Sequence, residues 1–128
     1  MSEKFTIEIL SPDSSILKTE TSEVVIPSYE GEMGILKDHI PLITFLRPGI
    51  LKIFGGDNKY FVEEGTVEFS DNNLLILTST AKELSKIDKD SLISLISDAE
   101  QKIVTEKITD KEKYLLTYKI DTLKNISQ

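Results

Sequence analysis

All six glycines and all four prolines of this 128-residue chain fall before residue 85. From Ser85 onward the apolar residues recur at spacings of three and four, whereas before it they alternate or form short runs. Alternation is typical of strands, and spacings of three and four are typical of helices. The sequence therefore predicts two regions: residues 1–84, built from strands, and residues 85–128, built from helices.

The first region consists of short apolar runs that end at turn-forming residues. Phe5, Ile7 and Ile9 occur at every second position, as in a strand with one buried face. Further runs occupy residues 24–26, 50–54, 60–62, 66–69 and 74–77. The glycine-containing residues 55–58 separate two runs, as in a hairpin whose turn needs a positive φ. Strands with turns about every ten residues predict an antiparallel β-sandwich or flattened barrel.

The second region predicts two amphipathic helices folded back on each other. The expected apolar stripe of the first helix consists of Leu92, Ile96, Ala99 and Ile103, and Ile93 and Val104 are expected to broaden it. The expected stripe of the second helix consists of Leu116, Ile120 and Leu123, with Leu115 and Ile126 beside it. Asp88 is the expected N-cap of the first helix, and Thr109 and Glu112 have capping-box spacing. Two helices alone bury too little apolar surface, so the hairpin must pack on the sandwich or on a partner.

Composition excludes several classes of function. The chain has no cysteine, which excludes disulfides, thiolate metal sites and cysteine nucleophiles. The formal net charge is −7 and Arg47 is the only arginine, so nucleic acid is not an expected partner. The whole of this net charge falls within residues 1–84, because residues 85–128 carry equal numbers of acidic and basic side chains. Without a run of about 20 apolar residues, no direct membrane insertion is expected.

Catalytic chemistry finds little support in the sequence. His39 is the only histidine, and its neighbour Asp38 is adjacent in the chain, which does not make it an orienting partner. Gly55 and Gly56 lack the lysine and hydroxyl residue of a phosphate-binding loop. We therefore expect no catalytic residue, no cofactor and no metal.

Two other classes of protein remain open at this point. A β-sandwich binding module for a peptide or sugar would expose Tyr29, Tyr60 and Tyr114 on one surface. A small hydrolase would need a cleft with a second titratable group in hydrogen-bond reach of His39.

The segment EGEMGILKDHIPLITFLRPGIL, residues 30–51, is the least generic part of the chain. It resembles the epsilon subunit of F-type ATP synthases, whose signature here is an acidic Gly-Glu turn, then Gly-Ile-Leu, a His-x-Pro and a Leu-x-Pro-Gly. The matching residues are Glu30, Gly31, Glu32, Gly34, Ile35, Leu36, His39, Pro41, Leu46, Pro48 and Gly49. The resemblance extends over nearly the whole chain and implies a ten-stranded antiparallel β-sandwich followed by a two-helix antiparallel hairpin.

The resemblance implies a non-catalytic central-stalk subunit of a rotary motor, which couples the gamma subunit to the c-ring for ion-driven ATP synthesis. The implied c-ring contacts are Tyr29, Glu30, Gly31, Glu32 and Met33, and the implied gamma contacts are His39, Pro41 and Leu42. In the family the acid matching Glu32 faces a basic loop of the ring. The isolated chain is expected to be a monomer, and the assembled F1 sector lies on the cytoplasmic face of the bacterial inner membrane.

In this family the C-terminal tail also regulates ATP hydrolysis. It either folds on the sandwich or extends beside gamma toward the alpha and beta subunits, where it opposes hydrolysis. In members whose tail binds ATP, the first helix opens with Ile or Leu, Asp, two residues, Arg and Ala. Here Ile87 and Asp88 match, but Ser91 and Leu92 stand at the last two positions. Without that arginine, Ile87 and Asp88 are expected to be a non-functional remnant.

We therefore predict that the isolated protein does not bind ATP. Lysine point charges hold a triphosphate less specifically than an arginine fork does, and the tail contains no arginine. Isothermal calorimetry with ATP should give no binding heat. A millimolar or tighter dissociation constant would contradict the prediction.

Overall fold

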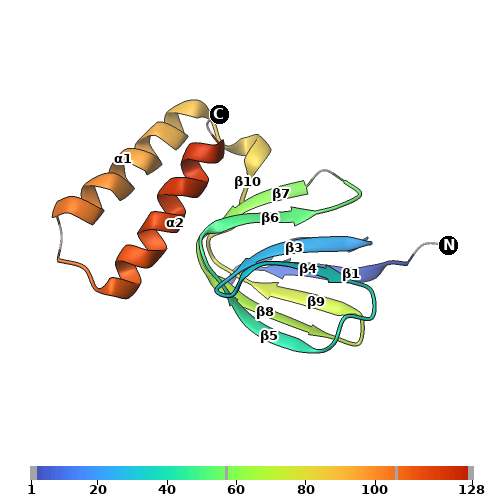
Figure 1. The fold of residues 1–128 in the computed structure, drawn as a ribbon. Coiled ribbons are helices and arrows are strands. Elements are labelled where there is room, and N and C mark those ends of the chain that lie inside the picture. Colours follow the sequence, from blue (N-terminus) through green and yellow to red (C-terminus); the bar gives the residue numbers. More distant parts are fainter. Residues whose placement is uncertain (1–2, 57, 106, 127–128) are drawn as a thin grey trace.

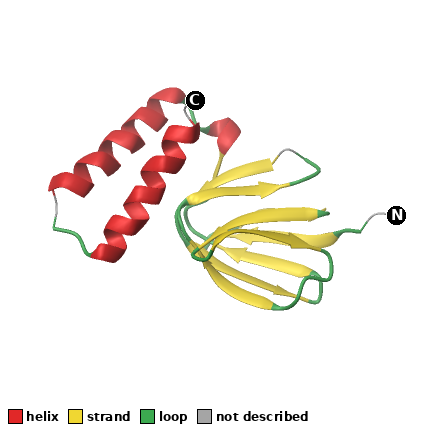
Figure 2. Cartoon of the chain, in the orientation of Figure 1, coloured by secondary structure: helices red, strands yellow, loops and turns green. Residues whose placement is uncertain are grey.

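A computed structural model describes residues 3–56, 58–105 and 107–126 of the chain. Its strands are β1 (Phe5–Leu10), β2 (Ser15–Thr21), β3 (Glu23–Ser28), β4 (Gly31–Leu36), β5 (Leu42–Leu46), β6 (Gly49–Ile53), β7 (Asn58–Val62), β8 (Gly65–Ser70), β9 (Asn73–Leu77) and β10 (Lys82–Glu83). A 3₁₀ turn, η1 (Leu84–Lys86), leads to helices α1 (Lys89–Thr105) and α2 (Asp110–Ile126). The predicted order of strands first and helical hairpin last is confirmed (Figures 1 and 2). Asp57, in the predicted 55–58 turn, lies outside the described residues.

The strands form one sheet that curls over on itself into a sandwich (Figure 1). Its order is β10-β7-β6-β3-β5-β8-β9-β1-β2, and β4 pairs with β3 off this path. Short turns connect β3 to β4, β6 to β7 and β8 to β9, so those pairs are antiparallel. The sandwich is thus mainly a set of hairpins laid side by side.

One pair departs from the predicted all-antiparallel arrangement. β1 pairs with β9 in parallel, from Thr6 opposite Asn73 to Leu10 opposite Leu77. A tight turn forces antiparallel pairing only on strands that it joins, and more than 60 residues separate these two. The sheet is therefore mixed, and the parallel pair completes its second layer.

The core lies between the two layers of the sandwich. In β1 the residues Phe5, Ile7 and Ile9 are buried, as their alternation predicts. They pack with buried residues of the facing strands, namely Val24, Ile26, Ile35, Leu46, Leu51, Val67, Phe69, Leu74 and Ile76. Phe5 meets Phe69 edge to face, with ring centroids 5.6 Å apart. Removal of this apolar surface from water is the main stabilisation of the sandwich.

Both helices begin at the caps that the sequence predicts. The Asp88 carboxylate accepts a 2.7 Å hydrogen bond from the Ser91 amide, which lowers the pKa of Asp88. At α2 the Thr109 hydroxyl accepts from the Glu112 amide and the Glu112 carboxylate accepts from the Thr109 amide, at 3.1 and 3.3 Å. This reciprocal pair is a capping box and satisfies two amides that the helix itself cannot.

The apolar stripe of α1 is narrower than predicted. Leu92 and Ala99 are buried, but Ile93 and Val104 are 57% and 77% exposed and do not broaden the stripe. Leu95, which the predicted stripe omits, packs beside Leu92 instead. Helical spacing alone gives the direction of the stripe but not its edges, which depend on how far the helix is rotated against the sandwich.

The helical hairpin packs on the sandwich through α2 and the start of α1. Leu123 of α2 and Leu92 of α1 are buried against Phe61 of β7, with Ile50 and Ile126 at the margin. Lys119 of α2 also reaches Glu63 at 2.7 Å. The support that the sequence requires for the hairpin is thus supplied by the sandwich.

Gly49 at the start of β6 allows β3 to pass close by. A Cβ at this position would lie 2.5 Å from the Cβ of Pro27, which is buried in β3. We predict that Gly49→Ala lowers the free energy of unfolding by about 1–3 kcal/mol, because one of the two strands must shift. Urea denaturation measures the change.

Gly34→Ala in β4 is the matched control. There the new Cβ would lie 3.6 Å from a carboxylate oxygen of Glu23, an ordinary contact. Its effect should stay within about 0.5 kcal/mol. Equal losses in the two variants would show that the close approach to Pro27 is not the cause.

Candidate functional site

The acidic turn, residues 29–33, is the end of the β3–β4 hairpin. Tyr29 and Glu30 form a two-residue turn between the paired Ser28 and Gly31, and Gly31 has φ +117°. The buried Ser28 hydroxyl donates to the Gly31 carbonyl at 2.7 Å and accepts from the Glu30 amide at 3.2 Å. Glycine adopts this φ without strain, so the chain can reverse tightly here. The turn is rigid and projects from the sandwich.

The two carboxylates of the acidic turn face solvent. Glu30 is exposed at the tip, and the side chain of Glu32 is 63% exposed. Glu32 has one cationic neighbour, Lys52 of β6, at 3.7 Å. An exposed ion pair of this kind contributes little energy in water. The carboxylate of Glu32 is therefore available to a stronger basic partner.

The other members of the acidic turn point elsewhere. Met33 is half-buried and packs on the core. Tyr29 turns toward the tail, where its ring stacks on Tyr114 of α2 with centroids 6.3 Å apart.

Tyr60 of β7 is buried, unlike Tyr29 and Tyr114. Its side chain is 5% exposed, and burial raises its pKa, with a further rise from the negative charge of Glu83. The three tyrosines that a binding module would expose together are therefore not on one surface.

The predicted gamma contacts lie at the other end of β4, on the loop before β5. His39 packs its ring on the edge of Phe69, with centroids 5.9 Å apart, and its Nδ1–H donates to the carbonyl of Ile40 at 2.7 Å. Pro41 is exposed and Leu42 is half-buried. These contacts are structural, and they occupy the ring nitrogen that an orienting carboxylate would use in a catalytic triad.

A pair of reciprocal hydrogen bonds fixes that loop. The Asp38 amide donates to the side-chain oxygen of Asn72 at 2.7 Å, and the Asn72 side-chain amide donates back to the Asp38 carboxylate at 2.9 Å. Both residues are left-handed, with φ of 67° and 59°. Asn and Asp tolerate this conformation better than most residues. Asn72, in the β8–β9 turn, thus holds His39 and Pro41 in place, a role that no local pattern in the sequence indicates.

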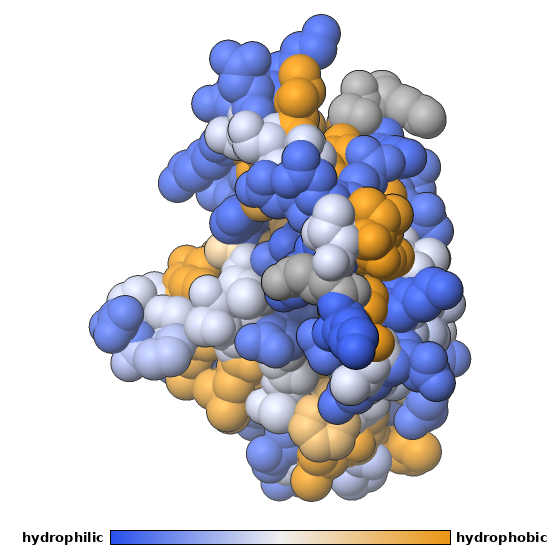
Figure 3. Space-filling model, turned by 90° about the vertical axis from the view of Figure 1, so that its left-hand side faces the viewer, coloured by the Kyte–Doolittle hydropathy of each residue, from blue (hydrophilic) through white to orange (hydrophobic). Residues whose placement is uncertain are grey.

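A second feature that the sequence analysis missed is an outer apolar face on β5, β9 and β1. Its members are Ile43, Phe45, Leu75, Leu77 and Leu10, and Thr66 and the exposed Glu68 of β8 lie between those of β5 and those of β9. Ile43 and Phe45 are 77% and 56% exposed although both are large and apolar. Hydrophobic residues gather along the lower margin of Figure 3, the side on which β5 lies in Figure 1. The signal in the sequence is the strand LITFL, which is apolar on both faces.

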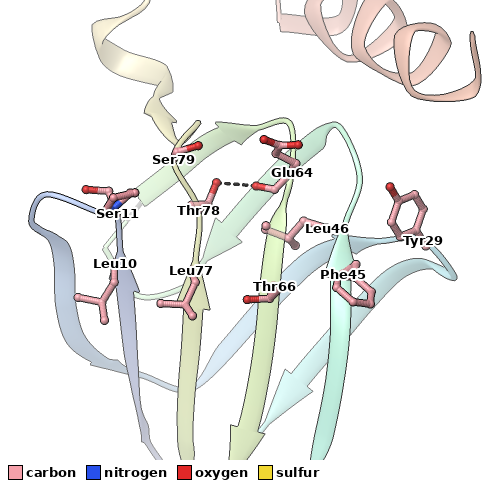
Figure 4. A pocket seen from close by; sticks show the side chains of 12 residues that line it. Leu10, Ser11, Tyr29, Phe45, Leu46, Glu64, Thr66, Leu77, Thr78 and Ser79 are labelled. Carbon is pink, nitrogen blue, oxygen red and sulfur yellow. Dashed lines mark hydrogen bonds between the residues drawn. The ribbon is translucent and has the colours of Figure 1, made fainter. Parts of the chain in front are cut away.

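The outer apolar face ends in a hollow of about 560 Å³. Figure 4 shows Leu10, Leu77, Thr66 and Phe45 in a row across its floor. Tyr29 and Glu64 stand at its rim, and the hydroxyl of Thr78 donates to the Glu64 carbonyl at 2.6 Å. An open apolar hollow without converging titratable groups suits a protein side chain better than a catalytic reaction.

Comparisons with known proteins identify the family. A family model described as "ATP synthase, Delta/Epsilon chain, beta-sandwich domain" matches residues 4–84. An ATP synthase epsilon chain from Pelagibacter ubique is 52% identical over 130 residues, which cover 99% of this chain and 100% of the relative. This chain belongs to the ATP synthase epsilon chain family. The resemblance that residues 30–51 carry is confirmed.

More distant epsilon chains agree with this assignment. One from Desulfitobacterium hafniense is 35% identical over 112 residues, covering 86% of this chain and 85% of the relative. The fold is similar to that of a chain in the cryo-EM structure of Euglena gracilis mitochondrial ATP synthase, OSCP/F1/c-ring. There the TM-score is 0.81 with 23% identity, covering 100% of this chain and 84% of that chain. This likeness in fold covers the two C-terminal helices as well as the sandwich.

In this epsilon-family chain, Ile87 and Asp88, which the sequence predicts to be a remnant of an ATP motif, lie where η1 meets α1. Ile87 and Ser91 line a shallow hollow together with Lys82 and Lys86. The carboxylate of Asp88 is committed to the N-cap of α1. Its role here is structural.

Two further properties of the epsilon-family chain concern metals and membranes. Within residues 3–56, 58–105 and 107–126, no three His, Asp or Glu side chains form a group that could hold a metal ion. Neither α1 nor α2, the helices of the described chain, combines the length and the hydrophobicity of a membrane span.

Proposed function

We propose that this protein is a non-catalytic central-stalk subunit of a rotary ATP synthase, which joins the gamma subunit to the c-ring during ion-driven ATP synthesis. The observation that carries the proposal is the acidic turn, exposed on a rigid hairpin in a chain of the epsilon family. The surroundings of His39 are structural, which supports a role in coupling rather than in chemistry. The subunit would sit in the F1 sector at the cytoplasmic face of the bacterial inner membrane.

The c-ring contact is proposed at Tyr29, Glu30, Gly31, Glu32 and Met33. Glu30 and Glu32 supply the charge, and the left-handed Gly31 supplies the tight turn that presents them. An acidic tip that is already ordered can bind a basic loop with little further loss of conformational entropy. Met33 is half-buried and packs on the core, so it also anchors the turn.

We predict that Glu32→Lys weakens the binding of the subunit to purified c-ring by about tenfold or more, because like charges then face each other across the contact. ATP synthesis in reconstituted membranes should fall with it. Glu20→Lys on β2 changes the net charge equally at an exposed position and is the matched control. Unchanged synthesis by Glu32→Lys at low salt would remove Glu32 from the contact.

The gamma contact is proposed at His39, Pro41 and Leu42, and we extend it over the outer apolar face. The pair of reciprocal hydrogen bonds between Asp38 and Asn72, which we call the Asp38–Asn72 clasp, holds the loop that contains His39 and Pro41 at the start of β5. Large apolar side chains that are exposed close together, as Ile43 and Phe45 are on β5, favour an interaction site. The loop leads directly into β5, and Phe45, toward the other end of that strand, lines the hollow.

We predict that Ile43→Asp reduces the amount of gamma that co-purifies with this subunit from membranes by about tenfold or more, because an unpaired carboxylate would be buried in an apolar contact. Circular dichroism should show an intact fold, since Ile43 is exposed in the free chain. Ile93→Asp on α1 replaces an equally large exposed residue and is the control. Equal recovery of gamma with both variants would argue against this face.

The tail is proposed to act as a brake on ATP hydrolysis when it extends toward the alpha and beta subunits. Its docking on the sandwich combines a small apolar cluster around Leu123, one ion pair of Lys119 and the contacts that Tyr114 and Tyr118 make with the sandwich. Such a limited contact can be exchanged for another one of similar energy. The lysines on α2 would then face acidic partners.

A further inference from the structure

The acidic turn and the tail meet through aromatic rings. The ring of Tyr29 stacks on Tyr114 of α2 with an angle of 23° between the planes. Tyr114 in turn meets Tyr118, one helical turn later, at 4.8 Å and 66°. Offset-stacked and edge-to-face pairs at these distances are attractive beyond the area they bury. A continuous row of three rings thus connects the tip of the β3–β4 hairpin to α2.

Arg47, the only arginine of the chain, joins the same row from the sandwich. Its guanidinium carbon lies 3.9 Å from the centre of the Tyr118 ring, and its Nη1 donates to the Tyr114 hydroxyl at 3.2 Å. Its backbone amide donates to the Pro27 carbonyl in β3 at 2.9 Å. Arg47 is therefore fixed to the strand that leads into the acidic turn. Arginine stacks on aromatic faces more effectively than lysine does.

Tyr29, Arg47, Tyr114 and Tyr118 together form what we term the aromatic latch. One side of the acidic turn belongs to the latch through Tyr29, whose amide also donates to the Phe45 carbonyl at 3.2 Å. The other side presents the carboxylates of Glu30 and Glu32 to solvent. Because the turn has only two residues between its strands, Tyr29 and Glu30 cannot reorient independently.

We propose that Tyr114 and Tyr118 are positioning residues for the acidic turn, so that docking of α2 and capture of the turn by its basic partner are energetically coupled. A docked α2 holds Tyr29 and with it the geometry of the adjacent carboxylates. By thermodynamic reciprocity, a partner that binds this geometry stabilises the docked α2 by the same factor. The identity of the partner as the c-ring rests on the proposed function above, whereas the latch itself does not.

The first test uses the isolated full-length chain and needs no partner. Amide hydrogen exchange along α2 reports how often the helix leaves the sandwich. Tyr29→Ala should speed this exchange by about threefold to tenfold, the range that one aromatic pair supports. Phe54→Ala removes a ring of similar exposure at the end of β6 away from α2 and should leave the rate unchanged (Figure 1). Equal rates in wild type and Tyr29→Ala would overturn the latch.

Conservative variants separate stacking from general damage to the turn. Tyr29→Phe keeps the ring and should restore the wild-type exchange of α2. Tyr114→Phe keeps the stack but loses the hydroxyl that accepts from Arg47, and its exchange should fall between those of wild type and Tyr114→Ala. If Tyr29→Phe exchanged as fast as Tyr29→Ala, ring stacking would not be the connection and the proposal would fail.

The second test adds detergent-solubilised c-ring to the same chains. Ring binding should slow exchange along α2 in wild type, and Tyr114→Ala, which leaves every proposed ring contact in place, should bind the ring several-fold more weakly and lose this slowing. If the wild-type chain bound the ring and the amide exchange rate along α2 did not change, the proposed coupling would be wrong. No binding of wild type at all would remove the ring as the partner and with it the proposed function, while the isolated-chain result still decides the latch.

Discussion

Strand β3 divides its backbone hydrogen bonds among three neighbours, and the rest of the structure depends on that division. It pairs along its whole length with β4, at its start with β6 and at its end with β5. Val24, which pairs with β6, and Ile26, which lies between the pairings with β6 and β5, are both fully buried. Because β3 is hydrogen-bonded to three strands, its C-terminal end is restrained. The acidic turn that follows it, and the Pro27 carbonyl that accepts from the Arg47 amide, are therefore held in place as well.

Local sequence signals predicted the elements well where each signal acts within a few residues. The alternation of Phe5, Ile7 and Ile9, the cap at Asp88 and the box at Thr109 all involve neighbours no more than four residues apart, and the structure confirms them. The turn at residues 29–33 was implied by the family resemblance of the segment around it, and the structure contains a two-residue hairpin turn there. Such features depend on residues that are close together in the sequence and therefore do not depend on how distant segments pack.

What the sequence could not supply are relations between distant segments. The parallel pairing of β1 with β9 follows from closure of the sheet, and no turn residue encodes it. The clasp between Asp38 and Asn72 and the contact of Arg47 with Tyr118 each join residues more than 30 positions apart. The exposure of Ile93 depends on the rotation of α1 against Phe61, which a helical stripe leaves undetermined. The candidate site combines both kinds of feature, so its tip was predictable and its supports were not.

The connection from β9 to the tail has a mechanical consequence. Thr78 and Thr80 bind the backbone of Glu63 and Glu64 through their hydroxyls, at 2.6 to 3.3 Å, just before the two-residue strand β10. These hydroxyl bonds tie the segment that leads into the tail to the β7–β8 turn, so a pull on that segment would load them before the ladder of β9.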